Sequence, residues 1–153
     1  MLIASKSPPL IESTARGLYC EKGNFYIDPL RRVDNALITH AHSDHARSGM
    51  KNYLTANAGV GILKERIGLK SPICGISYGE RQRIGNVTVS FHPAGHLLGS
   101  AQIRVEYRGE VWVVTGDYKI AQDISCEAFE AVQGQNLMTE ATFALPVYRW
   151  PDS

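Results

Sequence analysis

The sequence predicts an α/β layered fold with mixed sheets. Two observations support this fold class: most apolar residues fall in short runs or alternate with polar residues, and only two segments have helical character. Many short strands combined with a few helices are typical of layered α/β domains. The composition, 44% hydrophobic and 20% charged over 153 residues, is that of one globular domain, and it excludes collagen-like, low-complexity and disordered chains.

The strands are predicted from alternation and from short apolar runs. Residues 18–20 and 25–27 form a hairpin through the turn 21–24. Residues 87–92 alternate apolar and polar side chains, and residues 103–107 repeat that pattern before a turn at 108–110. The remaining strands are expected at residues 36–39, 53–56, 111–115 and 137–139.

Two helices are predicted, and the N-terminal residues are expected to be irregular. Asp44 is a residue type that caps helices, so a short helix is expected from Asp44 to about Met50. A second helix is expected over residues 59–67, ended by Gly68. Residues 1–16 contain two adjacent prolines and no strand pattern, so they are predicted to enter the fold without regular structure.

The sequence favours a cytoplasmic protein that does not enter a membrane. No run approaches the roughly 18 apolar residues of a membrane span, and the first residues lack the features of a signal peptide. Cys20, Cys74 and Cys126 are far apart and odd in number, so neither a disulfide framework nor a cysteine zinc site is expected.

The charge is unevenly distributed although the net charge is only +1. Residues 1–83 carry 12 Lys and Arg against 7 Asp and Glu, whereas residues 84–153 carry 4 against 8. A basic front half, including Arg31 and Arg32, is suited to phosphates. A solvated surface explains the charge of the front half about as well, and for Arg31 and Arg32 a solvated loop is the favoured interpretation.

The stretch His40-Ala41-His42-Ser43-Asp44-His45 carries the chemistry. It has the pattern HxHxDH and follows a predicted strand. Residues i and i+2 of an extended segment point the same way, so His40 and His42 can hold one cation. After a turn, Asp44 and His45 can hold a second cation nearby. Imidazole and carboxylate ligands suit zinc, manganese or iron.

Further candidate ligands follow other predicted strands. His96 follows the strand at 87–92 and Asp117 follows the strand at 111–115, and each fits a ligand better than a plain turn residue once the first cluster is considered. Asp28 follows the strand at 25–27 and is predicted to orient a ligating imidazole; the alternative is a turn before proline. His92 is either a hydrogen-bonded strand histidine or a residue behind the ligands.

These residues resemble the metallo-β-lactamase fold superfamily, in which HxHxDH is followed by a lone His and a lone Asp at strand ends. The stretches HPAGHLLGSAQI and TGDYK resemble its nucleic-acid-processing β-CASP branch. Glu140 matches the acidic residue that opens the β-CASP part. The stretch TEATFALPVYRWP is most similar to bacterial ligase-associated DNA exonucleases.

The resemblance implies an αββα fold with two divalent metal ions, zinc first and manganese or iron as alternatives. It assigns His40, His42 and His96 to one ion, Asp44 and His45 to the other, and Asp117 as a bridge. Asp44, Asp117 and Glu140 are the implied catalytic residues: Asp44 accepts a proton from water, and Glu140 fixes a ligand or the histidine that assists the leaving group.

The function implied is metal-dependent phosphodiester hydrolysis by a DNA exonuclease that acts in DNA repair beside a DNA ligase. An RNA-processing nuclease is the first alternative. A hydrolase of lactams or thioesters shares HxHxDH, but Glu140 and its flanks argue against it. A non-catalytic metal-binding fragment is the fourth hypothesis.

The chain differs from the family in length. A β-CASP insertion and a closing metallo-β-lactamase segment follow in the family, so residues 1–153 are expected to be a partial, N-terminal domain that lacks both after about residue 150. The second metal site is then expected to lack a ligand, and catalysis by this chain is expected to be weak or absent. Exposed apolar surface on a half-fold predicts self-association or a partner protein.

Overall fold

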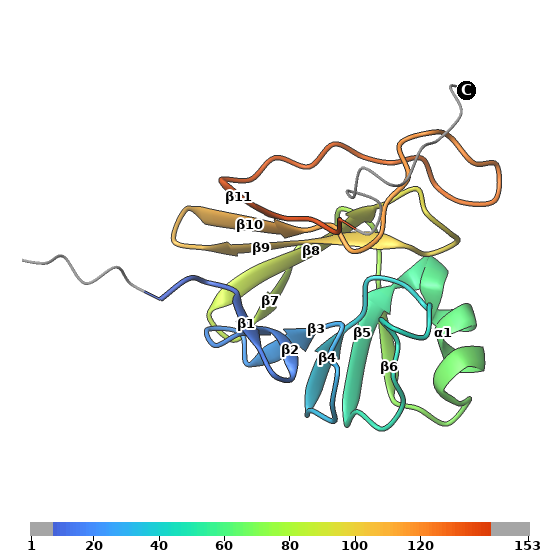
Figure 1. The fold of residues 1–153 in the computed structure, drawn as a ribbon, viewed down its shortest axis with the longest axis horizontal. Helices are drawn as coiled ribbons and strands as arrows, with labels where there is room; N and C mark the ends of the chain where they lie inside the picture. The colour runs from blue at the N-terminus through green and yellow to red at the C-terminus, as the bar shows by residue number, and fades with distance from the viewer. Residues whose placement is uncertain (1–7, 142–153) are drawn as a thin grey trace, which may run out of the picture.

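The computed structural model describes residues 8–141, in which the strands form two mixed sheets (Figure 1). In the first sheet the strand order is β1-β2-β3-β4-β5-β6. The first three strands are antiparallel, and β3 to β6 are parallel. Its strands are β1 (Glu12–Thr14), β2 (Gly17–Cys20), β3 (Phe25–Ile27), β4 (Asn35–Leu37), β5 (Asn52–Ala56) and β6 (Ile73–Ile76).

The second sheet has the order β11-β10-β9-β8-β7. Strands β7 to β10 are antiparallel, and β11 pairs parallel with β10, with Val113 opposite Leu137. Its strands are β7 (Gln82–Ile84), β8 (Val87–Pro93), β9 (Ala101–Tyr107), β10 (Glu110–Val114) and β11 (Asn136–Met138).

The two sheets pack face to face, and the helix α1 (Val60–Ile67) covers the outer face of the first sheet (Figure 1). Alternation along β4 explains both layers: Leu37 enters the core between the sheets, whereas Ala36 faces Leu63 of α1. The inter-sheet core is centred on Phe25, Phe91 and other fully buried side chains of both sheets. This arrangement confirms the predicted α/β layered fold with mixed sheets.

The predicted helix from Asp44 to Met50 is wrong. The segment forms a single turn, in which the amides of His45 and Ala46 both donate to His42 O, and then continues without helical structure. Gly49 has a φ of +90°, which a helix does not contain. The hydroxyl of Tyr53 bonds to Met50 N and to Arg47 O, so a strand side chain replaces helical hydrogen bonds.

The expectation of irregular structure up to residue 16 is also wrong, because Glu12–Thr14 forms β1 against β2. Thr14 Oγ1 donates to Gly17 O at 2.7 Å and closes the turn between them. Strands β6 and β7 were not predicted. The other predicted strands, and the second helix, lie where expected to within a few residues; a 3-10 turn, Asn57–Gly59, precedes α1.

Two expectations fall partly outside the described residues. The stretch from Thr139 to Pro151 and the domain end near residue 150 lie mostly in residues 142–153, which the structure does not describe. Within residues 8–141, no helix is both long enough and apolar enough to cross a membrane.

Candidate metal centre

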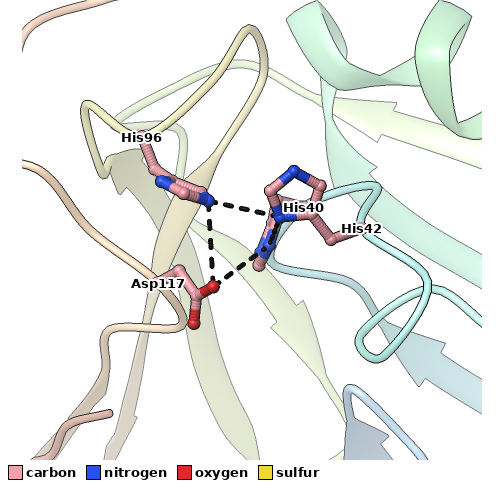
Figure 2. Close-up of side chains that lie close together, drawn as sticks. All are labelled: His40, His42, His96 and Asp117. Carbon is pink, nitrogen blue, oxygen red and sulfur yellow. Dashed lines mark hydrogen bonds and ion pairs between the residues drawn. The ribbon is translucent and has the colours of Figure 1, made fainter. Parts of the chain in front are cut away.

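Three chain segments bring potential ligands to the same edge of the two sheets (Figure 2). His40 and His42 lie in the loop after β4 of the first sheet, His96 in the connection between β8 and β9, and Asp117 after β10 of the second sheet. Their ligand atoms all lie within 4.8 Å of one another. The site is therefore formed where the two sheets meet.

The first group of ligands has the dimensions of a tetrahedral metal site. His42 Nδ1 lies 3.0 Å from His40 Nε2 and 3.3 Å from His96 Nε2. Asp117 Oδ2 lies 3.7 Å from each of the latter two nitrogens. Four ligands about 2.0–2.1 Å from a tetrahedral zinc ion lie about 3.3–3.4 Å from one another. The four separations above are close to these values and the other two are no longer than 4.8 Å, so these residues can converge on one divalent cation.

A second group lies on the other side of Asp117. Its Oδ1 atom is 3.4 Å from His45 Nε2, and that nitrogen is 3.6 Å from Asp44 Oδ2. The two carboxylate oxygens of Asp117 thus face different ligand groups. The Asp44 side chain is 74% exposed, so this group opens toward solvent, whereas His40 is buried.

Asp28 and Thr39 hold the imidazoles from behind. Asp28 Oδ1 accepts from Thr39 N at 2.8 Å, and Oδ2 accepts from the Thr39 hydroxyl at 2.6 Å and from His45 Nδ1 at 2.8 Å. Because the Thr39 proton is directed to Asp28, Thr39 Oγ1 accepts from His40 Nδ1 at 3.1 Å. Both rings then carry their proton on Nδ1, and both Nε2 lone pairs face the metal centre.

Burial favours the neutral form of two histidines in the first group, His40 and His96. Burial, aided by the neighbouring histidines, lowers the pKa of His40 from 6.5 to about 2. Burial also lowers the pKa of His96, although Asp117 opposes the shift. At His45 burial is the largest single influence and acts downward, but Asp28 and the other two carboxylates together raise its pKa. Neutral imidazoles are the form that binds a metal ion.

The loop that carries His96 is fixed from both sides. The hydroxyl of Ser100 accepts from the amides of His96 and Leu97 at 3.1 and 3.2 Å. Gly99 has a φ of +78°, and a Cβ atom there would overlap the backbone of Gly59, just before α1. The close approach of these two glycines locks the second sheet's ligand loop onto the first sheet.

Glu140 and His92 differ in their relation to the site. Glu140 lines a groove that also contains Asp44 and His45, and its charge acts to raise the pKa of His96, so it lies beside the second ligand group. His92 instead bonds to Ser90 Oγ at 3.0 Å and to Glu130 Oε1 at 2.9 Å, away from the ligands. Of the two alternatives for His92, the structure therefore favours the hydrogen-bonded strand histidine.

The structure brings together every residue that the sequence proposed for the centre. It adds Thr39, which the sequence analysis missed. Its position in the sequence could have identified it. Thr39 directly precedes His40 at a strand end, and alternation along the strand places its side chain on the opposite face from that of Ile38. The ligand assignment itself stays a prediction, and the donor set supports a divalent cation of unstated identity.

Comparisons with known proteins give the family context. No family model matches the chain. The chain is 28% identical over 140 residues to a protein of Opitutus terrae named probable DNA ligase, covering 90% of this chain and 14% of that protein. It is 32% identical over 119 residues to ribonuclease TTHA0252 of Thermus thermophilus, covering 61% of this chain and 27% of the ribonuclease. The chain therefore spans about a quarter or less of these relatives.

Solved structures share the architecture. A mutant of the CmlA β-hydroxylase aligns with a TM-score of 0.53 at 16% identity, over 75% of this chain and 32% of that chain. The SMB-1 metallo-β-lactamase aligns with a TM-score of 0.45 at 21% identity, over 61% of this chain and 46% of that enzyme. The likeness to the CmlA β-hydroxylase shows that the chain shares its fold over three quarters of its length. Within this fold, the two mixed sheets carry the ligand loops along their common edge.

Proposed function

We propose that the chain is the metal-binding part of a hydrolase that cleaves phosphodiester bonds of nucleic acid with two divalent cations. The observation that carries the proposal is the position of Asp117. Its two oxygens face two separate ligand groups, as a carboxylate that bridges two ions must. Paired cations about 3.5–4 Å apart are the recurring device for phosphodiester hydrolysis.

The residues divide the work. When bound, a pair of divalent cations supplies a nucleophile from water near neutral pH and neutralises charge on the phosphate. Asp44, the exposed carboxylate, accepts the proton of the attacking water. Asp28 and Thr39 keep both Nε2 lone pairs of the imidazoles in place. Glu140, at the rim of the groove, holds a ligand or the group that protonates the leaving oxygen.

DNA is the proposed substrate, cleaved by an exonuclease that acts in DNA repair beside a DNA ligase. The similarity to a protein named DNA ligase covers 90% of this chain and supports this assignment. RNA is the alternative. It is favoured by the ribonuclease of Thermus thermophilus and by endoribonuclease YSH1 of Gibberella zeae, which is 34% identical over 73 residues, 46% of this chain and 9% of that protein.

An activated diester tests the hydrolytic chemistry. Bis(p-nitrophenyl) phosphate has a leaving group that needs no proton donor, so the zinc- or manganese-loaded chain is expected to hydrolyse it. Asp117→Asn is expected to lower the rate at least about 100-fold, because a bridging ligand and its charge are lost. Asp34→Asn, a change at an exposed carboxylate away from the centre, should leave the rate unchanged.

The substrate class is tested separately. Labelled single-stranded DNA and RNA of one sequence are digested side by side, and release of mononucleotides from one end identifies an exonuclease. Preferential cleavage of RNA would replace DNA with the alternative substrate. Cleavage of a chromogenic lactam without any diester hydrolysis, or a wild-type diester rate in Asp117→Asn, would contradict the proposed function.

A further inference from the structure

A groove lined by four arginines begins at the ligand loop. The arginine groove is lined by Arg31, Arg32, Arg47 and Arg66, together with Ser43, Ala46 and neighbouring residues. It has a volume of about 440 Å³, and no acidic residue lines it. All four side chains are exposed, and none takes part in the ion pairs formed among residues 8–141. Four unneutralised guanidinium groups in one groove create a local site for an anion.

The arginine groove is connected to the metal centre. Leu30, half exposed, lines it and also lines the groove that contains Asp44, His45 and Glu140. Ser43, between two predicted ligands in the sequence, belongs to the arginine groove itself. The two grooves therefore adjoin at Leu30, next to the ligand loop.

A third groove adjoins the arginine groove at Arg32. Arg32 lines both, and its guanidinium lies against Gly49, where a Cβ atom would be 2.9 Å from Arg32 Nε. The third groove contains Arg16 and Lys51. It also contains two tyrosine rings, Tyr19 and Tyr26, whose centroids are 4.5 Å apart and whose planes are tilted by 31°. Asp34 is its one acidic lining residue.

We propose that these grooves form one track for the sugar-phosphate backbone of a single nucleic-acid strand, leading from the metal centre through the arginine groove to the tyrosine pair. This inference rests on the proposed function, because it assigns the path of the strand on one side of the cleaved bond. Guanidinium groups match phosphate oxygens in a bidentate geometry. Aromatic rings at the far end offer faces for stacking, a combination typical of sequence-neutral binding to single strands.

The track explains how a chain of net charge +1 can bind a polyanion. Only the local charge matters within a Debye length of about 8 Å at physiological salt. The arginine groove and the third groove together contain six basic residues and one acid, Asp34. The other acids of the track, Asp28, Asp44 and Glu140, line the groove at the metal centre. The contacts are to phosphates, so the track is expected to bind DNA and RNA strands alike.

Equilibrium binding without metal tests the track. The full chain is titrated in EDTA with fluorescent single-stranded DNA and, in parallel, RNA, and anisotropy is measured between about 50 and 200 mM salt. The test variant is Arg31→Ala/Arg47→Ala. The control, Lys70→Ala/Arg83→Ala, removes the same charge from exposed positions outside the three grooves. Thermal melts verify that both variants fold.

The expected result follows from counterion release. Each lost phosphate contact lowers the slope of log K against log salt by about 0.7 for a single strand, so the test variant loses about 1.4 in slope and about 25-fold in affinity near 0.1 M salt. The control is expected to retain the wild-type slope. Equal slopes for the test variant and the control would overturn the track, as would a wild-type chain that binds no strand at low salt.

Failure of the track and failure of the proposed function give different results. Hydrolysis of the small activated diester by the metal-loaded wild-type chain tests the proposed chemistry, whereas strand binding in EDTA tests the track without any reaction. If Arg31→Ala/Arg47→Ala reduces the salt slope but no protein hydrolyses the diester, the track is supported and the proposed chemistry is contradicted. If the salt slope of Arg31→Ala/Arg47→Ala is unchanged and the wild-type chain hydrolyses the diester, the proposed chemistry is supported and the track is contradicted.

Discussion

Asp28→Asn separates the support of the metal centre from its ligands, since Asp28 itself contacts no ion. Its Oδ2 atom receives the hydrogen bonds that fix the proton positions of His45 directly and of His40 through Thr39. An asparagine side chain has one oxygen and one NH2 group, so it can replace only one of the two carboxylate oxygens of Asp28 as an acceptor. If its amide group takes the Oδ2 position, it meets the N–H of His45, and the proton of that ring moves to Nε2, the nitrogen that faces Asp117.

The opposite orientation of the asparagine has a different cost. The amide group then faces the backbone N–H of Thr39, a residue that is only 1% exposed, and this buried donor loses its acceptor. An unsatisfied buried donor costs about 1–3 kcal/mol. Residues that orient metal-binding imidazoles typically contribute 10–100-fold to metal affinity, equal to about 1.4–2.8 kcal/mol. We expect a total loss in this range, divided between metal affinity and folding stability.

Two measurements on one variant test this reasoning. Calorimetric titration with zinc in the presence of a competing chelator gives the affinity, and urea unfolding in EDTA gives the free energy of unfolding. Asp34→Asn, in the same connection between β3 and β4, is the matched control and is expected to change neither quantity by more than about 0.5 kcal/mol. A variant Asp28→Asn with wild-type affinity and wild-type stability would refute the hydrogen-bond relay.

Three further changes test other parts of the structure. His42→Ala removes a ligand of the first group and is expected to lower the metal content of the purified protein by about one ion per chain, measured by elemental analysis; an unchanged content would exclude His42 as a ligand. Gly99→Ala is expected to destabilise the protein to urea by more than Gly109→Ala, because both positions have positive φ but only the new methyl group at Gly99 overlaps backbone. Equal losses would show that strain alone acts. Between pH 6.5 and about 2, His40 binds a proton in the unfolded chain but not in the folded one, so the metal-free protein should lose stability as the pH falls. His40→Gln should weaken this dependence, measured by urea unfolding at pH 7 and pH 5. An identical pH dependence in the variant would contradict the lowered pKa of His40.

The strands with a clear pattern were predictable, and those defined by tertiary pairing were not. Val87, Val89 and Phe91 alternate with polar residues, so β8 is visible in the sequence. Strand β1 has mostly exposed residues and forms because β2 offers a free edge, which no local pattern reveals. The segment after Asp44 has helical capping chemistry, but Tyr53 competes for its backbone groups from a different strand. Tertiary contacts therefore decided each of these errors.

The same distinction applies to the site. Four candidate ligands within six residues at a strand end predict a metal centre from the sequence, and the structure brings His96 and Asp117 from two further strand ends close to His40 and His42. The arginine groove was not predictable, because Arg66 lies in α1 and Arg47 in the ligand loop, and only the packing of α1 against the first sheet brings them together. In the sequence these arginines are indistinguishable from solvated surface charges.

The balance of charge at the centre connects the ligands with the track. In the proposed function, two bound divalent ions would bring a charge of +4, and the carboxylates of Asp44 and Asp117 would offset 2 of it. The lowered pKa of His40 keeps that residue neutral, so it adds no charge. The loaded centre therefore retains about +2 toward solvent, and the nearby charge of Asp28 reduces it further. Such a centre attracts a single phosphate but does not by itself orient a strand. The arginine groove extends the positive potential in one direction from the centre, over Leu30, while Glu140 bounds the same metal-centre groove. This asymmetry gives the strand a preferred direction of approach, which uniform surface charge could not provide.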